Sequence, residues 1–249
     1  MTALLTHQFR NEQLLFWRSR EAAVFVFLFP VLLFLLLGTV YDGTYHHHPL
    51  ADYLVAGLLG YGAANTAFGG LAIQLVLRRE QGMLKRIRAT PLPPALYIAA
   101  TLLSILAVFA MQSALLILLG RVVFNAHLPQ RPFALFAALM VGALSFAGLG
   151  VGLASVIRSA EGSSAVVNVV ILPMAFLSGS FGPTRDYPEV LQAVAEILPL
   201  KHLLDAITGI YLDNESLWEQ SWALLIVLVW GAFGLVVAMR RFRWEPREA

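Results

Sequence analysis

The side chains that could carry chemistry are few, and their positions exclude several classes of enzyme. The chain has no cysteine, and its two lysines are Lys85 and Lys201. A nucleotide-binding P-loop needs a lysine followed by serine or threonine. Here Arg86 follows Lys85 and His202 follows Lys201. The sequence therefore predicts no ATPase site and no bound cofactor in this chain.

The histidines and the acidic residues all lie outside the long apolar stretches. Intramembrane catalysis and proton-driven transport usually need an ionisable group at mid-membrane, so both are disfavoured. The three histidines at 46–48 are adjacent, and neighbouring side chains point in different directions. Because no further ligand is evident, no metal site is predicted.

Uncharged polar and small residues do occur inside the apolar stretches. The amides are Asn65, Gln74, Gln112 and Asn168. Buried amides in lipid usually hydrogen-bond between helices, and lining a substrate path is the alternative. The glycines at 148, 150 and 152 permit close helix packing, either within one subunit or across a dimer.

Six apolar stretches must position these residues. The composition is 59% apolar and 13% charged, against about 45–50% and about 25% in soluble domains. A membrane-spanning helix needs about 20 apolar residues. Stretches of that length without a charged residue are 22–41, 53–77, 89–120, 132–157, 162–184 and 220–239. The prolines at 91, 93 and 94 should delay the third helix to near Ala95. The predicted fold class is an all-α membrane protein with six transmembrane helices.

The positive charges predict the orientation. Of the 17 Lys and Arg residues, thirteen fall at the termini and in the loops after the second and fourth stretches. Cytoplasmic loops are enriched in Lys and Arg. Both termini are therefore expected in the cytoplasm of a cell whose inner or plasma membrane this chain crosses several times.

The remaining segments complete the domain organisation. Residues 1–21 are expected to form an amphipathic interfacial helix, and a disordered tail is the alternative. Its apolar side comprises Leu5, Phe9, Phe16 and Trp17, with Arg10, Glu12 and Arg18 elsewhere. Residues 22–240 form the single transmembrane domain, and 241–249 form a cytoplasmic tail.

Two loops carry unusual patterns. In the basic segment 78–94, Met83, Leu84 and Ile87 form an apolar patch on a short helix. An apolar patch that faces the cytoplasm needs a partner to cover it. The alternative is that the patch only anchors the loop at the membrane surface. The outer region 178–219 contains two short amphipathic pieces joined at Pro199, which favours extracellular surface or re-entrant helices.

One of these loops carries a family motif. EQGMLKRIRATPL at 80–92 is similar to the E-x-G-T-L-x-x-L-x-x-T-P-L pattern that follows the second span in permeases of the ABC-2 type. The matching residues are Glu80, Gly82, Leu84, Thr90, Pro91 and Leu92. Met83 stands where the family usually has Thr, and Ile87 where it usually has Leu.

A second motif lies at 171–209. It is similar to the family's P-x-x-F-L-S-G-x-F-x-P, a following proline and a late P-L-x-H-x-x-D-A. The matching residues are Pro173, Phe176, Leu177, Ser178, Gly179, Phe181, Pro183, Pro188, Pro199, Leu200, His202, Asp205 and Ala206. With the six-span plan, the chain resembles an ABC-2 permease, most similar to daunorubicin and multidrug-resistance permeases.

The resemblance implies a role for each unusual segment. The coupling helix, which docks into a separate ATPase subunit, would use Glu80, Gly82, Met83, Leu84, Ile87, Thr90 and Pro91. ATP and magnesium would be bound by that partner. Two permeases, as a homodimer or with a paralogue, would join two ATPases in the lipid membrane, and no nucleic acid would be involved.

The resemblance also implies a conduit between the subunits. Its candidate residues are Phe25, Phe29, Phe34, Asn65, Asn168, Pro173 and Phe176. The function expected is the permease subunit of a bacterial ATP-driven exporter, moving an apolar or amphipathic drug, lipid or lipid-linked molecule outward. The alternative is a membrane assembly factor or receptor that docks an ATPase without transporting. A membrane enzyme is disfavoured because no acid, base or nucleophile lies in a span.

Overall fold

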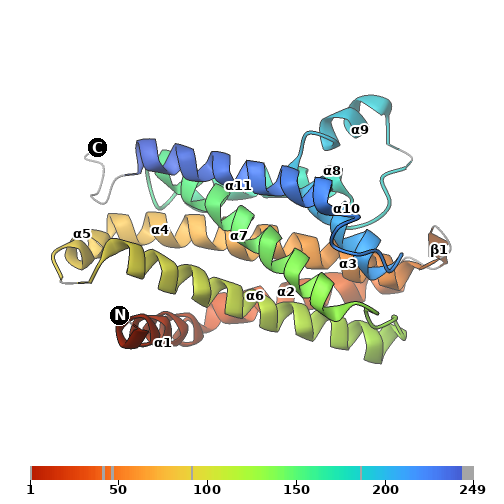
Figure 1. The fold of residues 1–249 in the computed structure, drawn as a ribbon, viewed down its shortest axis with the longest axis horizontal. Helices are drawn as coiled ribbons and strands as arrows, with labels where there is room; N and C mark the ends of the chain where they lie inside the picture. Colours follow the sequence, from red (N-terminus) through yellow and green to blue (C-terminus); the bar gives the residue numbers. More distant parts are fainter. Residues whose placement is uncertain (1, 41–42, 46–47, 91, 186, 243–249) are drawn as a thin grey trace.

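The computed structural model describes residues 2–40, 43–45, 48–90, 92–185 and 187–242. Figure 1 shows a bundle of helices that run side by side along its longest axis. The helices are α1 (Thr2–Arg18), α2 (Arg20–Val40), α3 (Leu50–Ala63), the π-helix η1 (Ala64–Gly70), α4 (Leu71–Glu80), α5 (Met83–Arg88), α6 (Pro94–Phe124), α7 (Pro132–Val156), α8 (Ser163–Ser178), α9 (Glu189–Ala195), α10 (Pro199–Tyr211) and α11 (Ser221–Arg241). The strands β1 (Thr44–Tyr45) and β2 (His48–Pro49) pair antiparallel. The prediction of a helical membrane protein is confirmed.

Five helices in the described part of the chain are long and apolar enough to cross a membrane. They are α2, the continuous rod Leu50–Glu80 made of α3, η1 and α4, and then α6, α7 and α11. Helix α6 begins at Pro94, where a proline at the first helical position loses no hydrogen bond. The predicted start near Ala95 is therefore confirmed. The helix continues beyond the predicted end at Gly120 to Phe124.

The predicted fifth span is shorter than expected. Helix α8 has 16 residues, about 24 Å at the usual rise, whereas a bilayer core is about 30 Å thick. It ends at Ser178 because Gly179 adopts φ +88°, a left-handed conformation that stops a helix. The charge-free stretch continues to Thr184, but the helix stops at Ser178, where the outer region 178–219 was predicted to begin. The count of six spans stays a prediction.

The rod Leu50–Glu80 forms the centre of the bundle. Every α3 residue except Ala51 and Tyr53 is buried, against neighbours that include α2, α6, α7 and α10. Its middle turn, η1, is a π-helix, a wide turn that is often found at functional sites. The rod therefore joins the two ends of the molecule through its core.

Glycines bring α7 and α11 into backbone contact. A Cβ atom on Gly148 would lie 2.6 Å from the carbonyl oxygen of Gly231, and one on Gly152 would lie 2.7 Å from that of Gly234. Gly150 faces the opposite side, where a Cβ would lie 2.6 Å from the carbonyl oxygen of Phe68. Of the two readings of this glycine stripe, packing within one subunit is the one that the structure supports.

Helix α1 buries polar side chains and exposes large apolar ones, which is the reverse of the expected arrangement. Its inward face, against α6, contains the buried Glu12 and the half-buried Gln13, whose amide nitrogen donates to the Ser104 carbonyl and hydroxyl oxygens at 3.0 Å. Its large apolar residues Leu14 and Trp17 are exposed. The amphipathic pattern predicted that Glu12 lies on the polar side of α1, exposed to water. This prediction is wrong, because the Glu12 carboxylate is buried and pairs with the buried Arg78.

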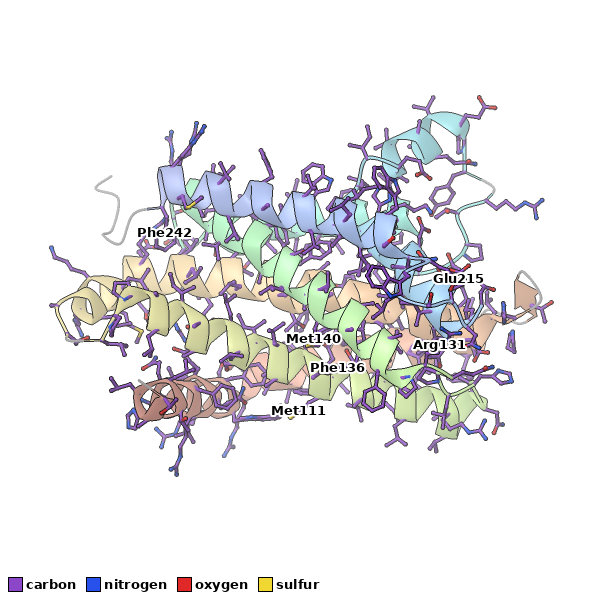
Figure 2. The ribbon with its side chains drawn as sticks, viewed as in Figure 1. Met111, Arg131, Phe136, Met140, Glu215 and Phe242 are labelled. Atoms are coloured by element: carbon purple, nitrogen blue, oxygen red, sulfur yellow. The ribbon has the colours of Figure 1, made fainter. Side chains whose placement is uncertain are left out.

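The region between α8 and α11 contains two short helices, as predicted. Helix α9 projects from the bundle at the end where β1 also lies (Figure 1). Helix α10 begins at Pro199 and buries one face, including Leu203 and Ile207, against neighbours that include α3, α7 and α11. Figure 2 places Arg131 and Glu215 near this end and Phe242 near the opposite end, toward α5. A re-entrant position in a membrane stays a prediction.

Candidate coupling site and substrate path

The corner between α4 and α5 depends on one glycine. Gly82 has φ +67° and ψ 11°, a left-handed conformation that glycine adopts without strain. A Cβ at this position would meet no atom within 4 Å. The backbone angle of Gly82, rather than crowding within the chain, therefore sets the direction in which α5 leaves α4.

Helix α5 exposes only part of the predicted apolar patch. Met83 is 36% exposed and Ile87 is half-buried, whereas Leu84 is fully buried inside the bundle. The prediction that Met83, Leu84 and Ile87 form one exposed apolar patch is therefore wrong for Leu84, which is buried. Thr90 follows the helix and donates to the Ile87 carbonyl oxygen at 2.6 Å. Pro91, the last predicted coupling residue, lies outside the described residues.

Glu80, the last residue of α4, is bonded within the chain. Its carboxylate accepts a hydrogen bond from the backbone N–H of Ala160 at 2.5 Å. Ala160 lies in the link between α7 and α8. Because the acceptor is charged, this hydrogen bond is strong. It connects the turn between α4 and α5 to the α7–α8 link.

Arg79 holds the end of α7. Its guanidinium donates to the carbonyl oxygens of Ala154 at 3.0 Å and Ile157 at 2.6 Å. The last carbonyls of a helix lack helical partners and carry partial negative charge. The side chain of Arg79 is buried, so it is part of the internal structure rather than a loop charge.

Arg78 forms a buried ion pair with the N-terminal helix. Its two terminal nitrogens donate to the Glu12 carboxylate oxygens at 3.0 and 2.6 Å, a two-pronged contact. The Tyr97 hydroxyl of α6 accepts from the same guanidinium at 2.6 Å, and Gln8 donates to Glu12 at 3.0 Å. The charges of Arg78 and Glu12 are thus compensated where water is largely excluded.

Three consecutive residues at the end of α4 therefore hold three parts of the protein. Arg78 binds α1 and α6, Arg79 binds the end of α7, and Glu80 binds the α7–α8 link. From the sequence, both arginines indicated only the orientation, and these contacts were not predicted. The sequence did contain a signal for a buried ion pair. Two arginines directly follow an apolar stretch, and the amphipathic N-terminal helix contains an acidic residue.

Three of the predicted conduit residues line one cavity. Phe25, Asn65 and Asn168, from α2, η1 and α8, border a space of about 530 Å³. Thr66 and Gln74 of the central rod add polar groups to its wall. The wide turn of η1 thus places an amide beside a cavity that extends toward α1.

A row of aromatic rings leads from this cavity. Phe25 stacks on Phe29 with ring centres 5.0 Å apart, and Phe29 lies 6.2 Å from Tyr61. Phe181 lies 5.1 Å from Tyr61 and 4.9 Å from Phe176. Two further predicted residues, Phe29 and Phe176, thus join Phe25 along a continuous apolar track.

The other two predicted conduit residues have different surroundings. Phe34 is fully buried and packs edge-to-face on Phe124 at 4.9 Å, inside the core of this one chain. Pro173 lies within α8, where its missing N–H leaves a carbonyl free. The amide of Gln112 bridges helices, because it accepts from Thr66 and donates to the Val26 carbonyl oxygen, both at 3.0 Å.

Comparison with known proteins places this architecture in a family. The profile of the family described as ABC-2 type transporter matches residues 4–212. The probable multidrug ABC transporter permease YbhR of Escherichia coli is 26% identical over 63% of this chain and 43% of its own length. The putative transport permease YvfS of Bacillus subtilis is 24% identical over 72% of this chain and 73% of its length.

Two further relatives are named for a phenotype. The linearmycin resistance permease protein LnrN of Bacillus subtilis is 22% identical over 70% of this chain, and nodulation protein J of Rhizobium leguminosarum is 33% identical over 39%. The matched part spans less than half the length of YbhR and LnrN. The chain belongs to the ABC-2 type transporter family, as a multi-pass membrane permease subunit rather than the ATPase of such a system.

Proposed function

We propose that this chain is the permease subunit of an ATP-driven exporter that moves an apolar or amphipathic molecule outward across a bacterial inner membrane. The main support for this proposal is the structure of the turn between α4 and α5. A short helix with Met83 exposed follows a turn whose preceding residues are bonded to α1, α6, α7 and the α7–α8 link. A partner that moves α5 would therefore move several elements of the bundle together.

The partner in this proposal is a separate ATPase that binds ATP and magnesium. Two ATPases assemble with two permeases, the second being an identical copy or a paralogue. ATP binding draws the ATPases together, and the complex then favours the bundle conformation that fits the closed pair. The word "multidrug" in the name of YbhR and "linearmycin resistance" in that of LnrN support a drug-like cargo.

Cargo-dependent ATP hydrolysis tests this function. The permease is co-expressed with an ABC-type ATPase subunit from the same genome, and the purified complex is reconstituted in lipid vesicles. Hydrolysis is expected to rise several-fold with an amphipathic drug, and the drug should accumulate on the side away from the ATPase. Co-purification without cargo-dependent hydrolysis or transport would instead support the assembly-factor alternative.

The proposed orientation predicts a labelling pattern. Because the chain has no cysteine, single cysteines can be introduced without background. In intact cells, Gln81→Cys should be protected from a membrane-impermeant thiol reagent, whereas Asn214→Cys should react. Both sites should react in opened membranes, which controls for folding. Labelling of Gln81→Cys in intact cells would overturn the orientation.

The conduit proposal predicts a change in transport rather than in assembly. Asn168→Leu removes an exposed amide from the cavity wall and should change cargo preference or rate by several-fold. Val169→Leu on the same helix, at a side chain that is 74% exposed and absent from that wall, is the matched control. If Asn168 instead binds another helix, its variant should lower the thermal midpoint in detergent and leave cargo preference unchanged.

A further inference from the structure

A cavity of about 430 Å³ lies at the α5 end of the bundle. Its wall comes from α4, α5, α6, α7 and α11. At this end of Figure 1, α6 and α11 are separated from each other, and α4 lies between them. None of the conduit candidates lines this cavity, so it belongs to a different part of the bundle.

The opening of this cavity faces the membrane. The exposed residues of its wall are all apolar, with side chains 40–79% exposed: Ile98 of α6, Leu144 of α7, and Leu235 and Met239 of α11. These three helices are long and apolar enough to cross a membrane. Side chains exposed on such helices meet hydrocarbon rather than water, so the occupant of the cavity comes from the lipid phase.

The two polar side chains on the wall already have partners. The Tyr97 hydroxyl accepts from Arg78 at 2.6 Å, and the Thr101 hydroxyl donates to the Tyr97 carbonyl oxygen at 3.0 Å. Among the described residues of this wall, no other side chain carries nitrogen or oxygen. A buried water needs two to four polar partners, and an empty apolar space loses dispersion contacts. An alkyl chain is therefore the group that fits.

The wall residues follow the helix axes. Leu235, Met239 and Phe242 are spaced i, i+4 and i+7 along α11 and its last residue, which spans about 10 Å. On α7 the wall extends from Leu144 to Val151, at the same spacing. A lipid acyl chain also runs parallel to membrane-spanning helices, so its methylene groups can lie along this wall.

Two arginines lie where this wall ends. Arg240 and Arg241 are the last residues of α11, directly before Phe242, and both side chains are exposed. In the part of the chain that the structure describes, neither pairs with a carboxylate. Long arginine side chains at the end of a spanning helix reach the headgroup layer, and guanidinium groups bind phosphate oxygens strongly. A basic end beside an apolar cavity is complementary to an anionic lipid.

We propose that this cavity binds one acyl chain of an anionic phospholipid, whose phosphate contacts Arg240 and Arg241. The bound chain covers the side of the bundle where Leu84 and Tyr97 are buried, and these two side chains connect α5 and Arg78 to the core. This lipid stays with the permease and is not its cargo. The inference therefore does not depend on the direction or the substrate of transport.

Photocrosslinking in lipid nanodiscs tests this site in the full-length permease without its ATPase. Ile98→p-benzoylphenylalanine places a photoreactive ketone at the rim of the cavity. The nanodiscs contain equal amounts of phosphatidylglycerol and phosphatidylcholine with the same acyl chains, and mass spectrometry identifies the crosslinked lipid. Phosphatidylglycerol adducts should exceed phosphatidylcholine adducts at least five-fold. Leu144→p-benzoylphenylalanine is a second rim reporter if the first variant does not fold.

Matched variants separate this site from general attraction to the membrane surface. Leu118→p-benzoylphenylalanine, at an exposed position of α6 outside the cavity, should crosslink the two lipids with less than a two-fold difference. Arg240→Gln combined with Arg241→Gln should lower the preference at Ile98 below two-fold. Arg10→Gln combined with Arg20→Gln removes the same charge from exposed positions on α1 and α2 and should leave the preference intact.

Two results would overturn the anionic lipid site. One is the absence of a lipid adduct, or equal adducts of both lipids, at both rim reporters. The other is an equal loss of preference in the two double arginine variants. Both leaflets of a nanodisc have the same composition, so the result does not depend on which side of the membrane α5 faces. Because neither cargo nor ATPase is present, either result leaves the export proposal standing.

Discussion

Glu12→Gln is expected to lower the free energy of unfolding of this permease by about 3–5 kcal/mol, because it leaves the buried Arg78 guanidinium without its counter-charge. Taking a guanidinium out of water is costly, and only a good ion pair with further hydrogen bonds compensates for it. The glutamine amide keeps the shape of the side chain, so the loss reports charge rather than packing. The thermal midpoint of the purified protein in detergent should fall accordingly.

Three further variants define this effect. Glu21→Gln, at an exposed acid at the start of α2, should change stability by less than about 0.5 kcal/mol. Tyr97→Phe removes one hydrogen bond to the guanidinium and should cost about 1.5–3 kcal/mol. The double variant Glu12→Met with Arg78→Met should be more stable than Glu12→Gln, because neither charge remains. Equal midpoints for Glu12→Gln and Glu21→Gln would contradict the buried pair.

Loss of export at normal expression is expected for Gly82→Leu and for Glu80→Lys. Leucine disfavours φ +67°, by about 1–2 kcal/mol, so α5 would leave α4 in another direction. Lysine cannot accept the N–H of Ala160, so the corner would lose its bond to the α7–α8 link. Transport and cargo-dependent ATP hydrolysis are measured in vesicles, with membrane insertion checked by immunoblot.

Two conservative variants separate the causes. Gly82→Asn tolerates the left-handed conformation and should retain export if the backbone angle matters, but lose it if the ATPase approaches Gly82 closely. Glu80→Gln keeps an acceptor for Ala160 and should retain export if that bond matters, but lose it if Glu80 meets a basic residue of the ATPase. Wild-type transport by either Gly82→Leu or Glu80→Lys, at normal expression, would remove the coupling assignment.

The apolar stretches predicted most of the helices for a simple physical reason. A run of about 20 residues without charge has no stable arrangement in a membrane other than a helix. The proline cluster before Ala95 likewise located the start of α6 because proline is accepted at the first helical position. The charge-free stretch overstates the length of α8 because the absence of charge does not mark a helix end, whereas the left-handed Gly179 does.

The buried contacts at the end of α4 could not be predicted in the same way. Arg78 pairs with a residue 66 positions earlier, and no local pattern reports such a pairing. Orientation rules treat every loop arginine as exposed, although Arg78 and Arg79 are both buried. The conduit candidates were chosen by residue type, and only the fold separates Phe25 at a cavity from Phe34 in the core.

The ion pair between Glu12 and Arg78 also has a consequence for synthesis on the ribosome. Helix α1 is synthesised before α4, and the guanidinium that pairs with Glu12 follows 66 residues later. At about 5–20 residues per second, this delay lasts about 3–13 s. During that interval the Glu12 carboxylate on the inward face of α1 lacks its counter-charge, so we expect α1 to stay at the membrane surface until α4 has been inserted. A codon change that slows translation between them should lengthen this exposed stage and increase degradation by membrane proteases.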